Sequence, residues 1–359
     1  MYKRQAPTRV ARLLPLSGRL APAGKAVRDG YLASYYAARS SGDAMFEVLI
    51  LDLDSYESVS AAYDAAIAQG ANMLVGPLSK QAVAELKSHP GRAVPVLALN
   101  RLEQTAAPAP GSSALVQFAL APEDEAVTIA NLAFGQGARS ALVIHPQSSR
   151  GDDLANALVT RWQELGGTVA NSIAYGYREE FSADVKIALD IPASEARAKE
   201  VGRMLGTNIE FNARRRQDID VIFLLSGNSA EARSIKPLLA FHYAGKLPVY
   251  STSSIYNGRP DPKDRDLEGI NFAETPWLLG SNPSLRSTIA AGAADSDTYT
   301  RLNALGADAF ILQVRFLQLQ AGPDALVRGN TGLLSMDPNL QIRRELSLAT
   351  FDGGAVKAQ

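Results

Sequence analysis

Short apolar runs alternate along the chain with stretches in which apolar residues recur at helical spacing. The first run covers residues 9–16, and a run this short that ends in a polar turn predicts a buried strand. Val27, Tyr31 and Ala38 then recur at helical spacing behind Pro22, whose missing N–H suits the first turn of a helix. The stretch therefore predicts a strand, a polar loop and an amphipathic helix.

The same unit recurs through most of the chain. Further strands are predicted at residues 46–51, 72–75, 94–99, 115–120, 141–144, 169–174, 219–225, 247–250, 333–336, 342–346 and 348–351. Helices are predicted at residues 59–69, 81–87, 123–134, 152–165, 181–189, 195–205, 230–240 and 299–320. Nearly continuous apolar strands that alternate with helices are typical of a parallel sheet covered on both faces. We therefore expect an α/β protein.

Two sets of these units share one layout, which predicts two lobes. A chain of 359 residues fits about two domains at ~150 residues each. The expected lobes are residues 8–120 plus 253–328 for lobe 1 and residues 121–252 plus 329–355 for lobe 2. The expected crossings lie near residues 120–122, 251–254 and 329–332, and residues 1–7 are expected to be a disordered or non-native leader.

Composition narrows the class of function. Lysine and arginine number 36 against 37 aspartates and glutamates, so the formal net charge is −1. A protein that binds nucleic acid normally carries a basic excess, so we expect no nucleic-acid partner. No apolar run reaches ~18 residues, and the first residues lack the apolar core of a signal peptide. The absence of cysteine excludes disulfides, thiol catalysis and cysteine–metal sites.

Catalytic and metal-binding motifs are missing from the sequence. It contains no G-x-S-x-G elbow, Ser-x-x-Lys pair, H-E-x-x-H motif, Walker loop or G-x-G-x-x-G motif. The histidines His89, His145 and His242 are far apart, and none has a partner at metal-ligand spacing. We therefore predict no metal, no cofactor and no enzymatic activity.

Two charged clusters have alternative interpretations. Asp52 and Asp54 lie two residues apart at the end of a predicted strand. They form either a paired-carboxylate site or a solvated strand end with a helix N-cap, which is the interpretation we favour. Residues 214–216 are three arginines, and such a run without interleaved aromatic residues is typical of a solvated loop.

Polar loops follow several of the predicted strands. The carboxyl ends of strands in open α/β sheets are where ligands bind, and helix N-termini behind them offer N–H groups to an anion. The resulting candidates for binding in a cleft are Ser17, Gly18, Arg19, Pro77, Ser79, Asn100, Arg101, His145, Gln147, Arg150, Ser226, Asn228, Ser251 and Thr252. The alternative is that these loops are ordinary short connections between strands and helices.

His145 lies at the carboxyl end of the first strand predicted for lobe 2. In this architecture that position points the side chain into the cleft. The imidazole would either contact a ligand or stabilise its own loop, and the sequence leaves both interpretations open.

Several stretches resemble a known family. LLPLSGRLAPAGKAVRDGYLASYY, GANMLVGPLSKQAVAEL and VPVLALNR are similar to the type 1 periplasmic-binding fold of the leucine-binding-protein kind. ALAPEDEA, ARSALVIHPQ, GDDLANALVTRWQELGGTV, DRDLEGINFAETPWLL and GLLSMDPNLQIRRELSLATFDGG resemble, more narrowly, the LppC/LpoA family of penicillin-binding-protein activators. So does the long stretch RRRQDIDVIFLLSGNSAEARSIKPLLAFHYAGKLPVYSTSSIYNGRP, and the resemblance covers about residues 8–354.

The resemblance implies a fold, a location and a partner. The fold would be that of type 1 periplasmic-binding proteins, with two doubly wound lobes whose parallel sheets are joined by crossover strands. The protein would be an outer-membrane lipoprotein facing the periplasm, which activates a class A penicillin-binding protein (a peptidoglycan synthase) without catalysis of its own. Its only link to the membrane would be a lipid anchor, which this chain lacks together with the N-terminal helical-repeat domain of longer members.

Two other functions remain as alternatives. The same fold would suit a periplasmic solute-binding protein for an amino acid, a peptide or a cell-wall fragment. Ser17, Ser79 and the loop amides could supply donors to a carboxylate, but no acidic partner for an ammonium group stands out. A wall hydrolase is the third interpretation, and no arrangement of nucleophile and base or of metal ligands supports it.

Overall fold

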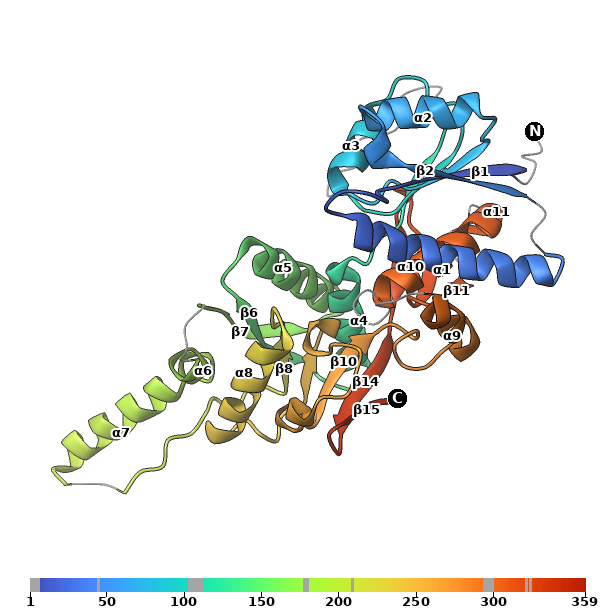
Figure 1. Cartoon of the computed structure of the whole chain (residues 1–359). Helices are drawn as coiled ribbons and strands as arrows, with labels where there is room; N and C mark the ends of the chain where they lie inside the picture. Colours follow the sequence, from blue (N-terminus) through green and yellow to red (C-terminus); the bar gives the residue numbers. More distant parts are fainter. Residues whose placement is uncertain are drawn as a thin grey trace. The chain divides into compact units, whose positions relative to one another are not determined.

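A computed structural model describes residues 7–43, 46–102, 113–176, 181–207, 210–292, 300–319, 322 and 325–359 (Figure 1). The chain divides into two compact units. Unit 1 comprises Met1–Ala121 and Thr275–Glu345, and unit 2 comprises Pro122–Glu274 and Leu346–Gln359. Most of the expected leader, residues 1–6, lies outside the described residues.

Unit 1 contains a parallel sheet of five strands in the order β2-β1-β3-β4-β5. The elements of its first segment are β1 (Arg9–Leu14), α1 (Ala21–Ser40), β2 (Glu47–Asp52), η1 (Leu53–Ser55), α2 (Val59–Ala68), β3 (Met73–Val75), α3 (Lys80–Ser88), β4 (Val96–Ala98) and β5 (Leu115–Gln117). Those of its second segment are α9 (Pro283–Gly292), α10 (Thr300–Val314), α11 (Phe316–Leu319), β11 (Val327–Arg328), β12 (Leu333–Met336) and β13 (Ile342–Glu345).

The period-2 alternation of β1 places its side chains in two separate cores. Val10 and Leu14 pack with α1 and α10, whereas Ala11 and Leu13 pack with α2 and α3 on the other face. Figure 1 shows these helix pairs on opposite sides of the sheet. A strand buried on both faces explains why its apolar run is nearly continuous, as the sequence predicted.

Helices α1 and α10 cross with their backbones in direct contact. A Cβ atom on Gly30 would collide with the carbonyl of Asn303, and one on Gly306 would collide with the carbonyl of Val27. The Asn303 side-chain amide donates to the Ala26 carbonyl at 2.9 Å across the same crossing. Both glycines are therefore required by the close approach of two helix backbones.

Alanine at either glycine is expected to destabilise unit 1. Because the obstacle is backbone, the helices must separate, and we expect Gly30→Ala and Gly306→Ala each to lower the free energy of unfolding by about 1–2 kcal/mol. Chemical denaturation measures this change. Gly135→Ala is the matched control, since a Cβ on this helical glycine would meet no atom within 4 Å. Equal stability of the three variants would contradict the packing argument.

The second segment of unit 1 is held by a buried carboxylate. Asp308 of α10 is fully buried and accepts hydrogen bonds from the backbone N–H groups of Asn330 (2.6 Å) and Thr331 (2.7 Å). It also accepts from the Asn330 amide at 2.9 Å and the Thr331 hydroxyl at 2.6 Å. Burial raises the pKa of Asp308, and these four donors act in the opposite direction. The carboxylate thereby fixes the turn between β11 and β12.

Unit 2 contains a mixed sheet of seven strands in the order β15-β14-β10-β9-β8-β6-β7. Its elements are α4 (Pro122–Gly135), β6 (Ser140–Pro146), α5 (Ser149–Glu164), β7 (Thr168–Tyr175), α6 (Ser182–Ala188), α7 (Ile191–Leu205), β8 (Val221–Leu224), α8 (Ser229–Phe241), β9 (Val249–Ser251), η2 (Ser253–Ile255), η3 (Pro262–Leu267), β10 (Ile270–Glu274), β14 (Ser347–Asp352) and β15 (Ala355–Ala358). Strands β6–β10 are parallel, and β14 and β15 extend the sheet antiparallel.

The core of unit 2 lies between α4, α5 and one face of this sheet. Trp162 of α5 is fully buried against Phe223 of β8, with ring centroids 5.2 Å apart. Its indole N–H donates to the Thr168 carbonyl at 2.9 Å, so its polar group is satisfied. Ile222 and Leu224 are also buried and alternate with Phe223, which directs them to the opposite face of the strand.

The predicted boundaries between the lobes differ from those of the units. Residues 253–274 belong to unit 2 rather than unit 1, because β10 pairs with β9 and β14 in the sheet of unit 2. Residues 329–345 belong to unit 1, because β11, β12 and β13 form an antiparallel sheet whose Val327, Leu334 and Ile342 join the core beneath α10. The change of unit near residue 121 agrees with the expected crossing.

The predicted elements are otherwise close to the observed ones. The long predicted helix at 299–320 is two helices in the described residues, α10 and α11, separated at Arg315. Strands β10, β11 and β15 and helix α9 were not predicted. Among the described residues, no helix is both long and apolar enough to cross a membrane.

Candidate functional site

Both sheets have the strand order that creates a crevice at the carboxyl ends of the strands. In unit 1 the order reverses between β1 and β3, and in unit 2 it reverses between β6 and β8. At such a switch point the two flanking loops run in opposite directions, which leaves room for a ligand. The loops of residues 17–19 and 76–79 flank the first switch point, and those of residues 145–150 and 226–228 flank the second.

The loop after β1 is closed by an aspartate from β2. The Ser17 hydroxyl donates to Asp52 Oδ2 at 2.7 Å, and the Leu16 N–H donates to Asp52 Oδ1 at 2.8 Å. Gly18 has a φ of 67°, which favours glycine, and the Arg19 side chain is exposed. Ser17 is therefore engaged inside the loop, and Arg19 is the residue of this loop with its charge in solvent.

Asp52 is also the N-cap of η1, where its carboxylate accepts the Asp54 N–H at 3.2 Å. Partial desolvation acts to raise its pKa, but the hydrogen bonds from Ser17, Leu16 and Asp54 outweigh it, so the pKa of Asp52 is lowered. The interpretation of this pair as a strand end with a helix N-cap is thus confirmed, since Asp52 caps η1.

The two other loops of unit 1 are tied to each other. Asn100 donates its amide to the Leu78 carbonyl at 2.8 Å and accepts the Arg101 N–H at 2.9 Å. Pro77, which follows a cis peptide bond, accepts the Leu99 N–H at 2.9 Å through its carbonyl. The Ser79 hydroxyl caps α3 by accepting the N–H of residue 82. Asn100 and Ser79 therefore organise backbone rather than project freely.

The loop after β6 in unit 2 has the same construction. Ser148 caps α5 by accepting the Gly151 N–H at 3.1 Å. His145 is buried, and its Nδ1 atom lies 3.3 Å from the Pro146 carbonyl and 3.5 Å from Asp152 Oδ1. These contacts fit the interpretation of His145 as a residue that stabilises its loop. Gln147 in this loop and Arg150 in the first turn of α5 are exposed.

A glutamate that the sequence analysis overlooked organises the loop after β8. Glu231 accepts the Gly227 N–H at 2.9 Å, the Tyr175 hydroxyl at 2.6 Å and the Asn228 amide at 2.9 Å. Asn228 in turn caps α8 by accepting the Glu231 N–H at 3.0 Å. The signal was present, because a capping residue followed three positions later by glutamate is a known helix start. The buried Ser226 hydroxyl has no partner in the described part of the chain.

The loop after β9 is held by a second overlooked glutamate. The Ser251 hydroxyl is fully buried and donates to the Leu224 carbonyl at 2.6 Å, and Thr252 shares a hydrogen bond of 3.0 Å with Ser254. The next residue, Ser253, donates its N–H and its hydroxyl to Glu125 at 2.8 and 3.0 Å. Glu125 lies in the first turn of α4, and its carboxylate fastens this loop.

The candidate residues therefore separate into two classes. Most of their hydroxyl and amide groups are used to cap helices or to join neighbouring loops, which is the ordinary role of polar loop residues. Arg19, Gln147 and Arg150 present exposed polar groups. No group of three or more metal-ligating side chains occurs within the described ranges. The arrangement supports a shaped protein surface better than a chemical site.

Comparison with known proteins shows which family the chain resembles. Residues 1–354 match the model of a family described as "LppC putative lipoprotein". The "Penicillin-binding protein activator LpoA" of Photobacterium profundum is 30% identical over 350 residues, which cover 97% of this chain and 56% of that protein. Its counterpart in Vibrio antiquarius is 28% identical over 352 residues, 96% of this chain and 57% of that protein. The chain thus spans about half the length of the curated relatives it matches.

Solved structures agree with this match. The "LpoA (YraM) C-domain from Haemophilus influenzae, a regulator of PBP1A" is similar with a TM-score of 0.76 and 26% identity, covering 98% of this chain and 99% of that domain. A "putative branched-chain amino acid ABC transporter" of Chromobacterium violaceum is similar with a TM-score of 0.70 at 24% identity, over 96% of this chain and 99% of that one. The second likeness shows the fold alone. The predicted type 1 periplasmic-binding fold is confirmed, and the match over residues 1–354 shows that this chain belongs to the LppC family, which includes the activator LpoA.

Proposed function

We propose that this chain is the synthase-binding part of a regulator that activates a class A penicillin-binding protein. The observation that carries the proposal is the likeness to the Haemophilus influenzae LpoA C-domain, which covers nearly all of both chains. That domain is described as a regulator of PBP1A. Because the similarity extends over both lobes, it supports the same regulatory role for this chain better than a similarity limited to one lobe would.

The geometry of the loops is consistent with action by binding rather than by catalysis. Ser17, Ser79 and Asn228 are engaged in capping or in closing their loops, so their side chains are not poised as nucleophiles or as general bases. An activator needs a stable surface that differs in affinity between two states of its partner. Rigid, internally bonded loops on a packed sheet provide such a surface.

The family also suggests where the protein acts. Its members are described as putative lipoproteins, and its LpoA members are described as penicillin-binding protein activators. We infer that the protein is held by a lipid at the periplasmic face of the outer membrane. The chain presented here would then be the portion that reaches the synthase.

The solute-binding alternative receives less support. Its basis is the fold shared with ABC-transporter binding proteins, and one fold serves many functions. An amino-acid site needs free donors for the carboxylate and a free acid for the ammonium group. Two acids beside the candidate loops of unit 2, Glu125 and Glu231, are both occupied by hydrogen bonds. In unit 1, Asp52 is occupied by the loop after β1.

The proposed function predicts binding and stimulation of a synthase. The 359-residue chain should bind the purified class A synthase of its own source, and the rate of peptide crosslinking should rise in proportion to the fraction of synthase bound. Binding is measured by microscale thermophoresis, and crosslinking by chromatography of digested product. A monofunctional synthase of another class is the control partner. Failure to bind the class A enzyme would contradict the proposal.

A further inference from the structure

Unit 2 carries an extension that its own core does not use. Helix α7 and the returning segment of residues 210–216 form this extension, which we call the α7 arm (residues 191–207 and 210–216). Figure 1 shows α7 reaching away from the sheet of unit 2. Within α7 the buried residues are Ile191 and Ser194, both in its first turn, and no later residue of the helix is buried.

The base of the arm is firmly attached. The Ser194 hydroxyl accepts the Arg214 N–H at 3.1 Å, which joins the two sides of the arm. Arg216 forms two parallel hydrogen bonds to Asp218, both 2.7 Å, and donates to the Ala170 carbonyl at 2.8 Å. The expectation of a solvated arginine loop is therefore incomplete, because Arg216 anchors the arm to β7. A fixed base means that the distal part is presented in a defined direction.

The distal part of the arm exposes apolar side chains. The exposed fraction is 75% for Met204 and 64% for Leu205. It is 45% for Val201 and 41% for Phe211. Within the described residues of unit 2, the other large apolar side chains with this degree of exposure are Ile187, Phe241 and Tyr243, which lie outside the arm. Val201, Met204 and Leu205 are spaced by three and four residues, so they share one face of α7. Such a group is the usual sign of an interaction surface, whereas single exposed apolar residues are ordinary.

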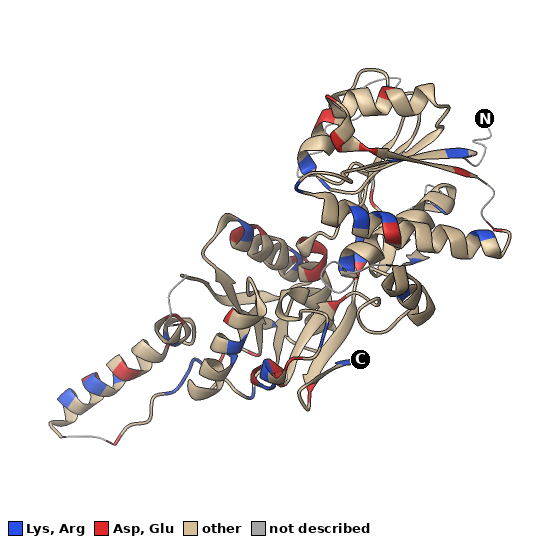
Figure 2. Ribbon diagram, viewed as in Figure 1, with Lys and Arg blue, Asp and Glu red and all other residues tan. Residues whose placement is uncertain are grey.

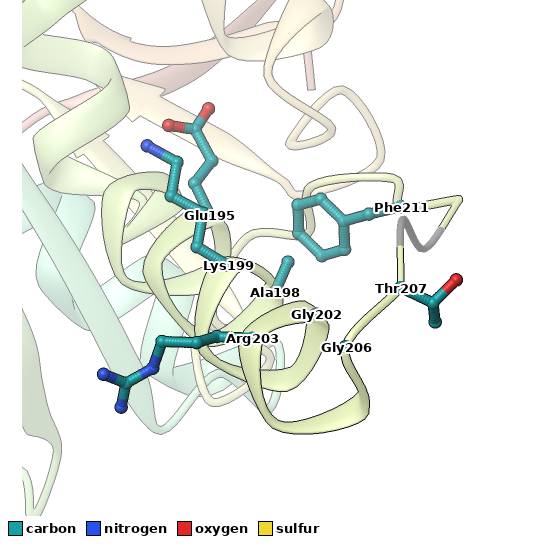
Figure 3. A pocket seen from close by; sticks show the side chains of 8 residues that line it. All are labelled: Glu195, Ala198, Lys199, Gly202, Arg203, Gly206, Thr207 and Phe211. Carbon is teal, nitrogen blue, oxygen red and sulfur yellow. The ribbon is translucent and has the colours of Figure 1, made fainter.

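A groove runs between α7 and the returning segment (Figure 3). Its volume is about 870 Å³, and its lining consists of Glu195, Ala198, Lys199, Gly202, Arg203, Gly206, Thr207 and Phe211. Ala198 and Gly202 are spaced by four residues and so share one face of α7, where a partner chain could approach the helix closely, and Gly206 follows as its C-cap. In Figure 3 the Phe211 ring points toward Ala198, and the Arg203 side chain extends away from the ring.

Helix α7 has little stability of its own, because it contains Gly202 and its residues after the first turn do not pack against a core. Glycine in a helix interior is unfavourable relative to alanine, and isolated helices of this length are marginal in water. The Glu200–Arg203 ion pair at 2.6 Å is exposed and adds little. A helix with this composition gains order when a partner covers it.

The charge of the arm indicates the chemistry of that partner. Residues 191–216 carry six arginines and lysines against three glutamates, in a chain whose formal net charge is −1. Figure 2 shows basic residues along α7 and the returning segment. Arg197 and Lys199 form no ion pair within the described part of the chain. A partner segment with apolar residues flanked by aspartate or glutamate would match both properties.

We propose that the α7 arm is the docking surface for an acidic, amphipathic segment of the class A synthase. The proposal rests on the proposed function, because it names the surface through which that partner is bound. In the groove, the carboxylates of the segment would face Lys199 and Arg203, and an apolar side chain would meet Phe211. Further apolar side chains of the segment would cover Met204 and Leu205, which lie outside the groove lining. Removal of these basic charges should slow association, and removal of the apolar contacts should speed dissociation.

Two double variants of the arm test the proposal. Lys199→Glu with Arg203→Glu reverses the charge, and Met204→Ser with Leu205→Ser removes apolar surface. Each should raise the Kd for the synthase by at least about tenfold, and the charge variant should also reduce the dependence of Kd on salt. The altered side chains are exposed, so circular dichroism and the thermal midpoint should stay close to those of the unaltered chain.

Matched controls come from unit 1. Lys25→Glu reverses an exposed charge on α1, and Leu317→Ser removes an apolar side chain that is 50% exposed. Neither should change Kd by more than about twofold. If the unaltered chain binds the synthase and the arm variants bind as tightly, the arm proposal is overturned while the proposed function stands. If the unaltered chain does not bind at all, both fall together.

Two other occupants give distinct results. If the arm contacts lipid, the unaltered chain will sediment with phosphatidylglycerol vesicles, the arm variants will not, and synthase binding will be unaffected. If the arm contacts a second copy, analytical ultracentrifugation will show a dimer that the Met204 and Leu205 changes abolish. Either result would overturn the assignment of the arm to the synthase.

Discussion

Replacing Asp308 with alanine is expected to lower the free energy of unfolding by about 4 kcal/mol. The carboxylate accepts four hydrogen bonds from Asn330 and Thr331, which are themselves buried. Truncation would leave two backbone N–H groups and two side-chain donors without a partner, and each such buried group costs about 1–3 kcal/mol. Local rearrangement would let some of these groups find other partners, so the expected loss is smaller than the sum of the four separate costs.

Urea denaturation of the 359-residue chain measures this effect. Asp352→Ala is the control, because Asp352 pairs with Lys357 at an exposed position and should change stability by less than about 0.5 kcal/mol. Asp308→Asn should be intermediate, since the amide can still accept hydrogen bonds through its oxygen but presents its NH₂ group to other donors. A loss below about 1 kcal/mol for the alanine variant would show that the carboxylate does not hold this turn.

Replacing Arg12 with methionine is expected to raise the free energy of unfolding by about 2–3 kcal/mol. Arg12 lies in β1, is fully buried, and forms no ion pair within the described residues. Its guanidinium stacks on Tyr31, with Cζ 2.9 Å from the ring centroid, and its three nitrogens find no hydrogen-bond partner there. Burial lowers the pKa of Arg12 from its usual value to about 10. This difference corresponds to a cost of ~3 kcal/mol for keeping the charge.

The sign of the pH dependence follows from that lowered pKa. Below about pH 10 both the folded and the unfolded chain carry the charge, so folding bears the full cost. Above about pH 10 the folded chain loses this proton before the unfolded chain does, and the cost declines as pH rises. At neutral pH the methionine variant should therefore be the more stable one. Arg12→Lys, which retains a buried cation and loses the stacking, should not be stabilised. Destabilisation by methionine would mean that the contact with Tyr31 outweighs the cost of burial.

The architecture was predictable because the two cores depend on simple periodicities. The run that became β1 is apolar on both faces, and the helix behind it repeats at helical spacing through Val27 and Tyr31. The exception is Arg12, whose position in β1 gave no indication that its charge would be buried. From sequence alone, a single charged residue in an apolar strand is expected to lie at the edge of the strand with its charge in solvent. Only the residues that surround it in the fold show that it is buried.

The boundaries between the two units were harder to predict from the sequence. β10 is short and contains Asn271 and Glu274, so it lacks the continuous apolar pattern of the other strands. It is a strand because β9 and β14 lie on either side of it, which no local pattern reveals. The same limit applies to β11–β13, whose core contacts come from α10 rather than from sequence neighbours.

The candidate site was predictable in position but not in role. The polar loops do follow strands at the switch points of both sheets. Whether a loop serine is free or engaged depends on partners distant in sequence, such as Asp52 for Ser17 and Glu125 for Ser253. The sequence predicted α7 as a helix but not that it protrudes, because a helix that packs on a core and one that protrudes have the same apolar period.

The most direct test of the account is the rate of peptide crosslinking by the class A synthase with and without this chain. The synthase is held at fixed concentration, and the chain is added from zero to an excess over its measured Kd. We expect a saturable rise in rate whose midpoint equals that Kd, and a midpoint shifted at least about tenfold by the α7 arm variants. No change in the rate when the synthase is saturated with the chain would contradict it.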